Sequence, residues 1–420
     1  MGCSKNLVDS ERLLHSFAEI GFKAHHNPER LHGDVVVINT CGFISDAQEE
    51  SINMVLECCR AREEGKIKRV YVMGCLTERF RDELAAEIPE VDGWYGKFDW
   101  VNIISDLAPG SEPTSWHRTL TTPGHYAYLK ISEGCNRRCA FCAIPLSTGS
   151  LCSRPLEEIV DEARALVAKG VKEINVIAQE LTSYGLDLYG RRRIADLIDA
   201  LAGVEGIEWL RLHYAYPTDF PEDMLDAMAR NSNVCRYLDI ALQHISDRVL
   251  NNMHRHINGQ QTRALLQKIR DKVPGIVIRT TLMVGFPGEE EEDFNQLLDF
   301  VREQCFDRMG AFAYSPQEGT FAFSHFDDTV PEEVKQQRLD RLMSLQESIA
   351  AELAEQRIGS TMRVIVDSEN EDCYVCRSEF DSPEVDPEIL VEKSRTLRPG
   401  DMVDVRITSA EPFELFATPV

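Results

Sequence analysis

Six apolar stretches, each followed by a helical pattern, dominate the middle of the chain between residues 120 and 330. The expected strands are 126–131, 173–178, 209–214, 237–242, 276–284 and 309–314, with helical patterns such as 155–169 and 289–303 between them. Continuous apolar runs separated by amphipathic helices are typical of buried parallel strands. Six such units are two short of a closed eight-stranded barrel, so we predict an α/β fold with an open, partial (βα)6 barrel. Its chemistry is expected at the carboxyl ends of the strands.

Three cysteines, Cys135, Cys139 and Cys142, lie in one short loop directly after the first of these strands. The spacing C-x3-C-x2-C provides three thiolates without an adjacent fourth ligand. A 4Fe-4S cluster normally takes four cysteines, so three leave one iron open for a substrate or cofactor. The alternatives are a zinc site that lacks its fourth ligand, or three unrelated buried thiols. Because structural zinc sites prefer paired C-x2-C spacing, we interpret the loop as a cluster site.

The first 105 residues carry a second set of three cysteines, spread along the sequence. Buried strands predicted at 34–40 and 69–74 are followed by Cys41 and Cys75, and Cys3 precedes a predicted helix. The carboxyl ends of parallel strands meet at one edge of a sheet, so these thiols are expected to lie close together. Nearby helix N-termini would favour thiolates. Single buried cysteines are common, but three at equivalent strand-to-helix turns predict a second cluster.

The remaining sequence predicts two further modules. Residues 332–358 have the pattern of a charged amphipathic helical linker, and residues 360–420 return to short alternating strands that favour a small β-barrel. Residues 361–420 contain fourteen acidic and six basic side chains, and the whole chain has a formal net charge of −25. An RNA-binding surface should be basic, so direct RNA binding is not expected to dominate. A basic protein partner, by contrast, would be attracted.

The composition also bears on the compartment of the protein. No apolar run approaches the length that spans a bilayer, and the first residues lack the apolar core of a signal peptide. Thirteen cysteines in such a chain point to metal ligation or redox chemistry rather than to disulfides. We therefore expect a cytoplasmic protein without membrane contact.

Over essentially its whole length the sequence resembles the radical S-adenosylmethionine (SAM) methylthiotransferases. The segments that carry the resemblance are GCSKNLVDSE (2–11), INTCGFI (38–44), KISEGCN (130–136), AQELTSYGLDLYG (178–190), HYAYP (213–217), LQHISD (242–247) and VGFPGE (284–289). The aromatic Phe141 directly before the last loop cysteine belongs to the same pattern. Several segments look like the branch that modifies an aspartate of small-subunit ribosomal protein twelve.

The resemblance implies two 4Fe-4S clusters, one that cleaves SAM and an auxiliary one that carries the sulfide or polysulfide to be inserted. The ligand sets that it implies are Cys135, Cys139 and Cys142 for the first and Cys3, Cys41 and Cys75 for the second. An electron donor protein would supply the electron that cleaves SAM, and the resulting radical would abstract hydrogen from the aspartate β-carbon. No general base is expected, because an unactivated C–H bond has no acid–base route near neutral pH.

SAM contacts are expected from Gln179, Arg211 and Gln243, each at or near the carboxyl end of a barrel strand. The C-terminal barrel resembles a TRAM domain, and the implied protein substrate is the basic ribosomal protein. The sequence departs from the family pattern at Thr148, where an arginine is expected after the cluster loop. Threonine cannot replace the bidentate anion clamp that a guanidinium forms.

Two alternative functions remain open at this point. The first is a methylthiotransferase that acts on an adenosine in transfer RNA, against which the acidic tail argues. The second is a non-catalytic iron–sulfur protein, which would need four ligands for each cluster where the sequence supplies three.

Overall fold

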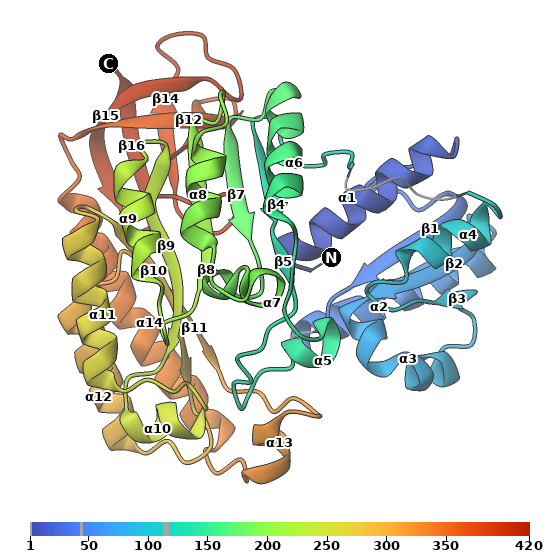
Figure 1. Cartoon of the computed structure of the whole chain (residues 1–420), viewed down its shortest axis with the longest axis horizontal. Coiled ribbons are helices and arrows are strands. Elements are labelled where there is room, and N and C mark those ends of the chain that lie inside the picture. The colour runs from blue at the N-terminus through green and yellow to red at the C-terminus, as the bar shows by residue number, and fades with distance from the viewer. Residues whose placement is uncertain (1, 43–44, 112–116) are drawn as a thin grey trace.

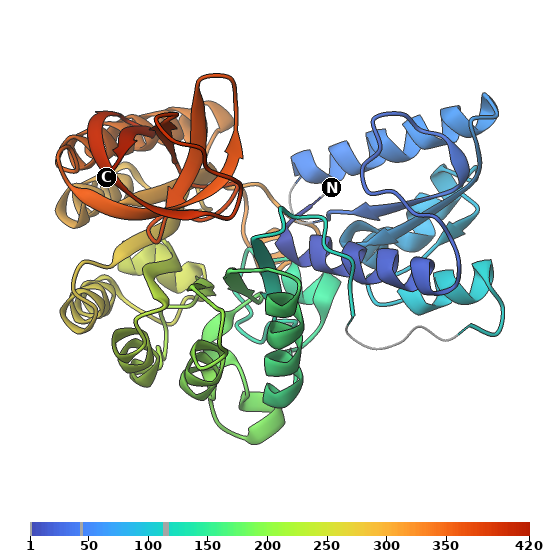
Figure 2. The same cartoon turned by 90° about the horizontal axis from the view of Figure 1, so that it is seen from above.

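The computed structural model describes residues 2–42, 45–111 and 117–420, which form three units in chain order (Figure 1). Phe43 and Ile44, at the end of the segment 38–44, lie outside the described residues. In both views the N-terminal unit and the C-terminal barrel lie on opposite sides of the molecule (Figures 1 and 2). None of the helices in these three described ranges is long and apolar enough to span a bilayer.

The N-terminal unit is a parallel three-stranded sheet in the order β1-β2-β3 with helices on both faces. Apolar side chains of α2 pack on one face and those of α1 and α4 on the other, so the central strand is buried on both sides. Burial on both faces explains the continuous apolar run of that strand. The elements are α1 (Ser4–Glu19), β1 (Gly33–Thr40), α2 (Ser45–Glu63), β2 (Ile67–Gly74), α3 (Cys75–Glu87), β3 (Gly93–Trp94) and α4 (Trp100–Leu107).

The central unit is an open parallel sheet of six strands in the order β11-β10-β9-β8-β7-β4. All six strands were predicted from the sequence, and each lies within three residues of its predicted bounds. They are β4 (Tyr126–Lys130), β7 (Glu173–Ile177), β8 (Trp209–Ala215), β9 (Val234–Gln243), β10 (Val277–Val284) and β11 (Arg308–Ala313). The prediction of a partial α/β barrel is therefore confirmed.

Helices cover the outer face of this sheet, and short elements follow the strands at their carboxyl ends. The helices that alternate with the strands are α6 (Leu156–Ala168), α8 (Ile194–Ala202), α9 (Glu222–Arg230), α11 (Gly259–Lys272) and α12 (Glu291–Gln304). The short elements are β5 (Ser132–Glu133), α5 (Ile144–Thr148), β6 (Cys152–Ser153), η1 (Leu181–Ser183), α7 (Leu186–Tyr189), α10 (Asp247–Asn252) and α13 (Phe321–His325).

The helix α14 (Glu332–Glu355) leads into a closed five-stranded barrel, which confirms the predicted small β-barrel. Its strands are β12 (Thr361–Glu369), β13 (Cys373–Ser378), β14 (Glu388–Glu392), β15 (Met402–Glu411) and β16 (Glu414–Pro419). Figure 1 places this barrel at the end of the six-stranded sheet opposite α5. It therefore covers the amino ends of the strands and leaves their carboxyl ends to the cysteine loop.

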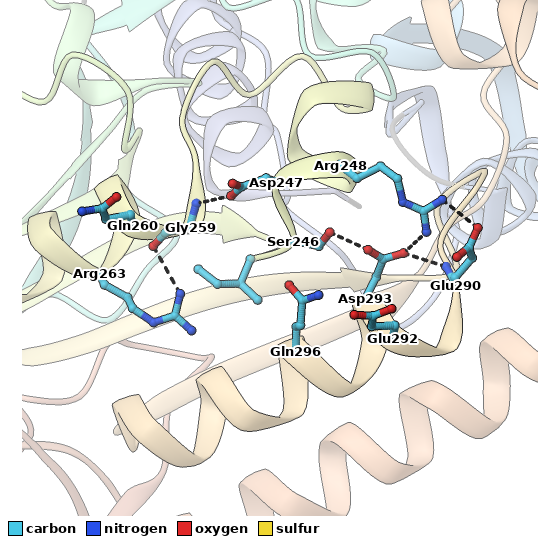
Figure 3. A pocket seen from close by; sticks show the side chains of 11 residues that line it. Ser246, Asp247, Arg248, Gly259, Gln260, Arg263, Glu290, Glu292, Asp293 and Gln296 are labelled. Carbon is cyan, nitrogen blue, oxygen red and sulfur yellow. Dashed lines mark hydrogen bonds and ion pairs between the residues drawn. The ribbon is translucent and has the colours of Figure 1, made fainter.

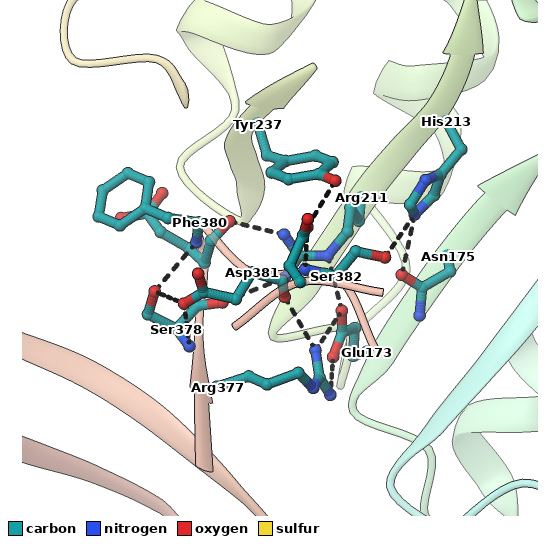
Figure 4. Close-up of polar contacts among 12 residues, drawn as sticks. Glu173, Asn175, Arg211, His213, Tyr237, Arg377, Ser378, Phe380, Asp381 and Ser382 are labelled. Carbon is teal, nitrogen blue, oxygen red and sulfur yellow. Dashed lines mark hydrogen bonds and ion pairs between the residues drawn. The ribbon is translucent and has the colours of Figure 1, made fainter. Parts of the chain in front are cut away.

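In the loop after β13, Phe380, Asp381 and Ser382 lie beside side chains from the central strands (Figure 4). Glu173, the first residue of β7, is fully buried and pairs with Arg211 at 2.9 Å and with Arg377 at 2.8 Å. Tyr237 donates to Asp386 at 2.7 Å, and Arg308 pairs with Asp381 at 2.6 Å. We call this set of contacts the basal polar network.

The basal polar network corrects one prediction from the sequence. Arg211 is not placed to contact SAM, because it lies near the amino end of β8 rather than at its carboxyl end. Its guanidinium pairs with Glu173 and donates to the backbone carbonyls of Ser378 and Glu379, at 3.3 and 2.7 Å. The side chain is fully buried and serves the interface between two units of the chain.

Candidate active site

The loop 135–142 follows β4 and is held by backbone hydrogen bonds to two other segments of the chain. Gly134, with φ of 69°, makes the turn into it, and a Cβ there would lie 2.0 Å from the carbonyl oxygen of Ser150. The Cys135 N–H donates to the Gly149 carbonyl at 3.2 Å, and the Ala140 N–H donates to the Met253 carbonyl at 3.0 Å. The loop is therefore shaped by the fold before any ligand binds.

The three thiols of this loop lie close enough together to influence one another. Burial raises the pKa of Cys142 to about 12, and the neighbouring Cys139 and Cys135 add to the increase. Burial likewise raises the pKa of Cys135 to about 11. Three neighbouring thiolates are therefore costly unless a positive charge joins them, and bound iron supplies that charge. The donor set fits an iron–sulfur cluster with one open iron.

The second set of cysteines converges at the carboxyl edge of the N-terminal sheet. Cys3 directly precedes α1, Cys41 follows β1, and Cys75 begins α3. Burial raises the pKa of Cys75 to about 12; Lys97 opposes this rise, and Cys3 and Cys41 add to it. Thiols that are far apart in the sequence thus lie together, as the topology predicted.

Two glycines and one asparagine shape this second site. A Cβ on Gly42 would lie 2.7 Å from the backbone of Leu76, so only glycine lets the chain after Cys41 pass the start of α3. Gly74 has φ of 115°, which favours glycine directly before Cys75. Asn6 donates to the carbonyl of the β1 residue Thr40 at 3.0 Å, which ties α1 to the strand end.

Among residues 2–42, 45–111 and 117–420, no three His, Cys, Asp or Glu side chains converge closely enough to hold a single metal ion. In a 4Fe-4S cluster each thiolate binds a different iron, so its ligands need not converge on one point. The absence of a site for a single metal ion among these residues therefore does not argue against clusters at the two cysteine sets.

A buried chain of charged groups lies between the two cysteine sets. Lys97 of the N-terminal unit is 2% exposed and pairs with Glu133 at 2.7 Å, across the boundary with the barrel. Lys130 also pairs with Glu133 and with Asp9 of α1. Burial alone would raise the pKa of Glu133, but Lys130 and Lys97 lower it to about 2. These pairs fix the two cysteine-bearing units relative to each other.

Gln179 and Gln243 lie at the carboxyl ends of their strands, as predicted. Gln179 follows β7 and donates to Glu133 at 3.0 Å. Glu133 lies two residues before Cys135, the first cysteine of the loop. Gln243 ends β9, is buried, and has φ of 72°. Their Oε1 atoms are buried and have no hydrogen-bond partner among the described residues. Such atoms suit a polar ligand, so both residues remain proposed SAM contacts.

Gln243 allows the proposed role to be separated from the fold. Gln243→Ala and Gln243→Gly are both expected to weaken SAM binding about three- to tenfold, since each removes one hydrogen bond. The glycine variant should be about 1 kcal/mol more stable than the alanine variant, because positive φ strains residues with a Cβ. Calorimetric SAM titration and urea unfolding would measure these effects. Unchanged SAM affinity in both variants would contradict the assignment.

Sequence reasoning missed two residues beside the loop, Arg255 and Tyr216. The guanidinium of Arg255 donates to the Sγ of Cys139 at 3.2 Å, and the hydroxyl of Tyr216 lies 3.4 Å from the same sulfur. Arg255 follows α10 and Tyr216 follows β8, both far from the cysteines in sequence. Tyr216 belongs to the segment 213–217 that carries the resemblance, but its residue type alone did not indicate a contact with a cysteine. The expected arginine position, Thr148, instead donates its hydroxyl back to the Ile144 carbonyl at 2.9 Å.

A pocket beside α10 contains no cysteine and is distinct from this site (Figure 3). Three of its charged side chains pair with one another: Arg248 contacts Glu290 at 2.9 Å and also pairs with Asp293, which accepts from Ser246 at 2.6 Å. These groups already have partners within the protein. Their contacts join the start of α12 to α10 and to the loop after β9.

Three family models match consecutive parts of the chain. They are the radical SAM superfamily at residues 129–301, the uncharacterized protein family UPF0004 at 1–96 and the TRAM domain at 358–420. Among solved structures, the radical SAM methyltransferase TsrM from Kitasatospora setae has a TM-score of 0.55 at 17% identity, covering 77% of this chain and 74% of that one. At that identity the likeness concerns the fold alone.

The open barrel, the three-cysteine loop after its first strand and the matching family model define a radical SAM enzyme. Two curated relatives are named ribosomal protein uS12 methylthiotransferase RimO. The protein of Phocaeicola vulgatus is 56% identical over 100% of this chain and 97% of its own length, and that of Cytophaga hutchinsonii is 48% identical over 99% and 95%. The chain belongs to the RimO family of radical SAM methylthiotransferases. This family implies SAM and 4Fe-4S clusters as cofactors.

Proposed function

We propose that this chain transfers a methylthio group to the β-carbon of an aspartate in ribosomal protein uS12. The observation that carries the proposal is the convergence of two separate sets of three cysteines, joined by the buried Lys97–Glu133 pair. Insertion of sulfur into an unactivated C–H bond requires one site that forms the radical and a second site that holds the sulfur donor. The names of the relatives supply the substrate.

Each set of residues has a definite role in this proposal. Cys135, Cys139 and Cys142 bind the SAM-cleaving cluster, and Cys3, Cys41 and Cys75 bind the auxiliary one. When bound, these groups and SAM supply one-electron cleavage, carbon-centred radical chemistry and the sulfur to be inserted. Gln179 and Gln243 orient SAM through their free amide oxygens.

The charge of the chain favours a basic partner. With a net charge of −25, the protein attracts a cationic ribosomal protein and repels the phosphate backbone of RNA. A low-potential electron donor protein supplies the reducing electron, and with a ribosomal substrate we place the reaction in the cytoplasm.

The test is anaerobic reconstitution with iron and sulfide, followed by incubation with SAM, a strong reductant and a basic peptide that copies the aspartate loop of uS12. Intact-mass analysis should find one methylthio group in place of one hydrogen on the aspartate. A matched peptide with asparagine at that position is expected to remain unmodified. SAM cleavage without a modified peptide, repeated with whole uS12, would contradict the substrate and favour transfer RNA.

A further inference from the structure

Arg255 is a buried cation without a carboxylate partner among the described residues. Its side chain is 2% exposed and lies in the loop that follows α10. One terminal nitrogen donates to the Cys139 sulfur at 3.2 Å and the other to the Ala241 carbonyl. Its Nε is buried and has no hydrogen-bond partner in the described part of the chain. A buried guanidinium is costly unless an anion compensates it, so this one calls for an anionic ligand.

Tyr216 orients Arg255 toward the same sulfur. The guanidinium of Arg255 lies over the Tyr216 ring, 4.1 Å from its centroid. The Tyr216 hydroxyl lies 3.4 Å from the Cys139 sulfur. Cys139 is thus approached by a permanently charged donor and by a hydroxyl that can donate to a thiolate.

The charge of the proposed ligand explains this arrangement. A 4Fe-4S cluster with three thiolates is anionic, and reduction by one electron makes it more so. A cation and hydrogen bonds at a cluster sulfur stabilise the reduced form more than the oxidised form, and therefore raise the reduction potential.

We propose that Arg255, oriented by Tyr216, is a positioning residue that raises the reduction potential of the SAM-cleaving cluster through Cys139. This rests on the proposed assignment of Cys135, Cys139 and Cys142 to that cluster. When bound, the cluster would supply the one electron, taken from an external one-electron reductant, that splits a C–S bond of SAM into methionine and a carbon-centred radical. Arg255 gains and loses no proton in either transfer.

The test is a redox titration of the full-length reconstituted protein, with the reduced cluster measured by electron paramagnetic resonance. It is made in a background with Cys3, Cys41 and Cys75 changed to alanine, so that one cluster contributes the signal. In Arg255→Met the ratio of reduced to oxidised cluster at a fixed potential should fall about tenfold, equivalent to about 59 mV. Arg255→Lys keeps the charge, and Tyr216→Phe removes the weaker donor. Each should lower the ratio about two- to threefold.

Arg137 offers a matched control on the same aromatic ring. Its guanidinium also lies over Tyr216, at 4.3 Å, but donates to Glu180 at 3.0 Å and to Thr182 at 3.1 Å rather than to a cysteine. Arg137 and Glu180 both act on the Cys135 thiol with opposite signs, so Arg137→Met should also lower the ratio, but clearly less than Arg255→Met does.

Other outcomes would overturn the proposal. An unchanged reduction potential in Arg255→Met would overturn it. If that variant also bound SAM more weakly, the guanidinium would instead be assigned to the SAM carboxylate. Should Arg255→Met fail to bind iron, Arg255→Lys and Tyr216→Phe decide, and unchanged potentials in both overturn the proposal. Because the potential is measured without a peptide, failure of methylthiolation would leave this result standing.

Discussion

Replacing Cys139 by alanine is expected to abolish SAM cleavage, with a loss of more than about a hundredfold. Changes to groups that merely support a metal ligand already cost 10–100-fold, and Cys139 is the proposed ligand itself. The variant should lose about four of about eight irons after reconstitution, because one of two four-iron clusters is lost. Iron and sulfide analysis, and 5′-deoxyadenosine formation with a strong reductant, would measure both effects.

Two matched variants make this result specific. Cys75→Ala should lose a similar amount of iron yet retain SAM cleavage, because it affects only the auxiliary set. Cys152 is exposed in β6, outside both sets, so Cys152→Ala should retain all the iron and all the activity. Loss of SAM cleavage in Cys75→Ala, or of iron in Cys152→Ala, would contradict the assignment of the two sets.

Replacing Glu173 by glutamine is expected to lower the free energy of unfolding by about 3–5 kcal/mol. The carboxylate is fully buried between Arg211 and Arg377, and its neutralisation leaves Arg211 with backbone carbonyls as its remaining partners. Urea unfolding under identical anaerobic conditions would measure the difference. Trp209 is buried where the two barrels meet, so its fluorescence reports this interface.

A surface pair provides the control for this variant. Glu303 pairs with Arg263 at 2.8 Å, but both side chains are at least 40% exposed. Glu303→Gln should therefore cost less than about 1 kcal/mol. Equal effects of the two substitutions would contradict a stabilising role of the basal polar network.

The same carboxylate makes the stability depend on pH in a defined direction. Burial would raise its pKa, but Arg377 and Arg211 lower the pKa of Glu173 below its ordinary value of 4.5. Its contribution is therefore complete above pH 4.5 and is lost as the pH falls toward the lower folded-state pKa. The Glu173→Gln variant should consequently lose less stability than the wild type on acidification below pH 4.5.

The fold could be predicted from the sequence because its signals are local. Each strand of the central sheet is rich in apolar residues, and the cysteines of the loop 135–142 lie within eight residues of one another. The convergence of Cys3, Cys41 and Cys75 was predictable from topology, since each occupies the same turn between elements.

The side chains around the candidate site could be predicted less well because their partners are distant in sequence. Arg211 is the third residue of the strand predicted at 209–214, but its partners at residues 173, 378 and 379 could not be predicted from that position. Arg255 is brought to Cys139 by tertiary packing across more than a hundred residues. No periodicity or motif in either stretch indicates which sulfur or carboxylate the guanidinium will meet.

The basal polar network has a consequence for experiments that divide this protein into modules. Deleting residues 360–420 would expose Glu173, Arg211 and Arg308. It would remove Arg377, Asp381 and the Glu379 carbonyl that contact them, and leave only the Glu173–Arg211 pair. Such a truncation would report misfolding of the barrel rather than loss of substrate docking. The C-terminal barrel closes the amino-terminal end of the central sheet. Replacing it by a related domain should succeed only if that domain also carries the counterparts of Arg377 and Asp381.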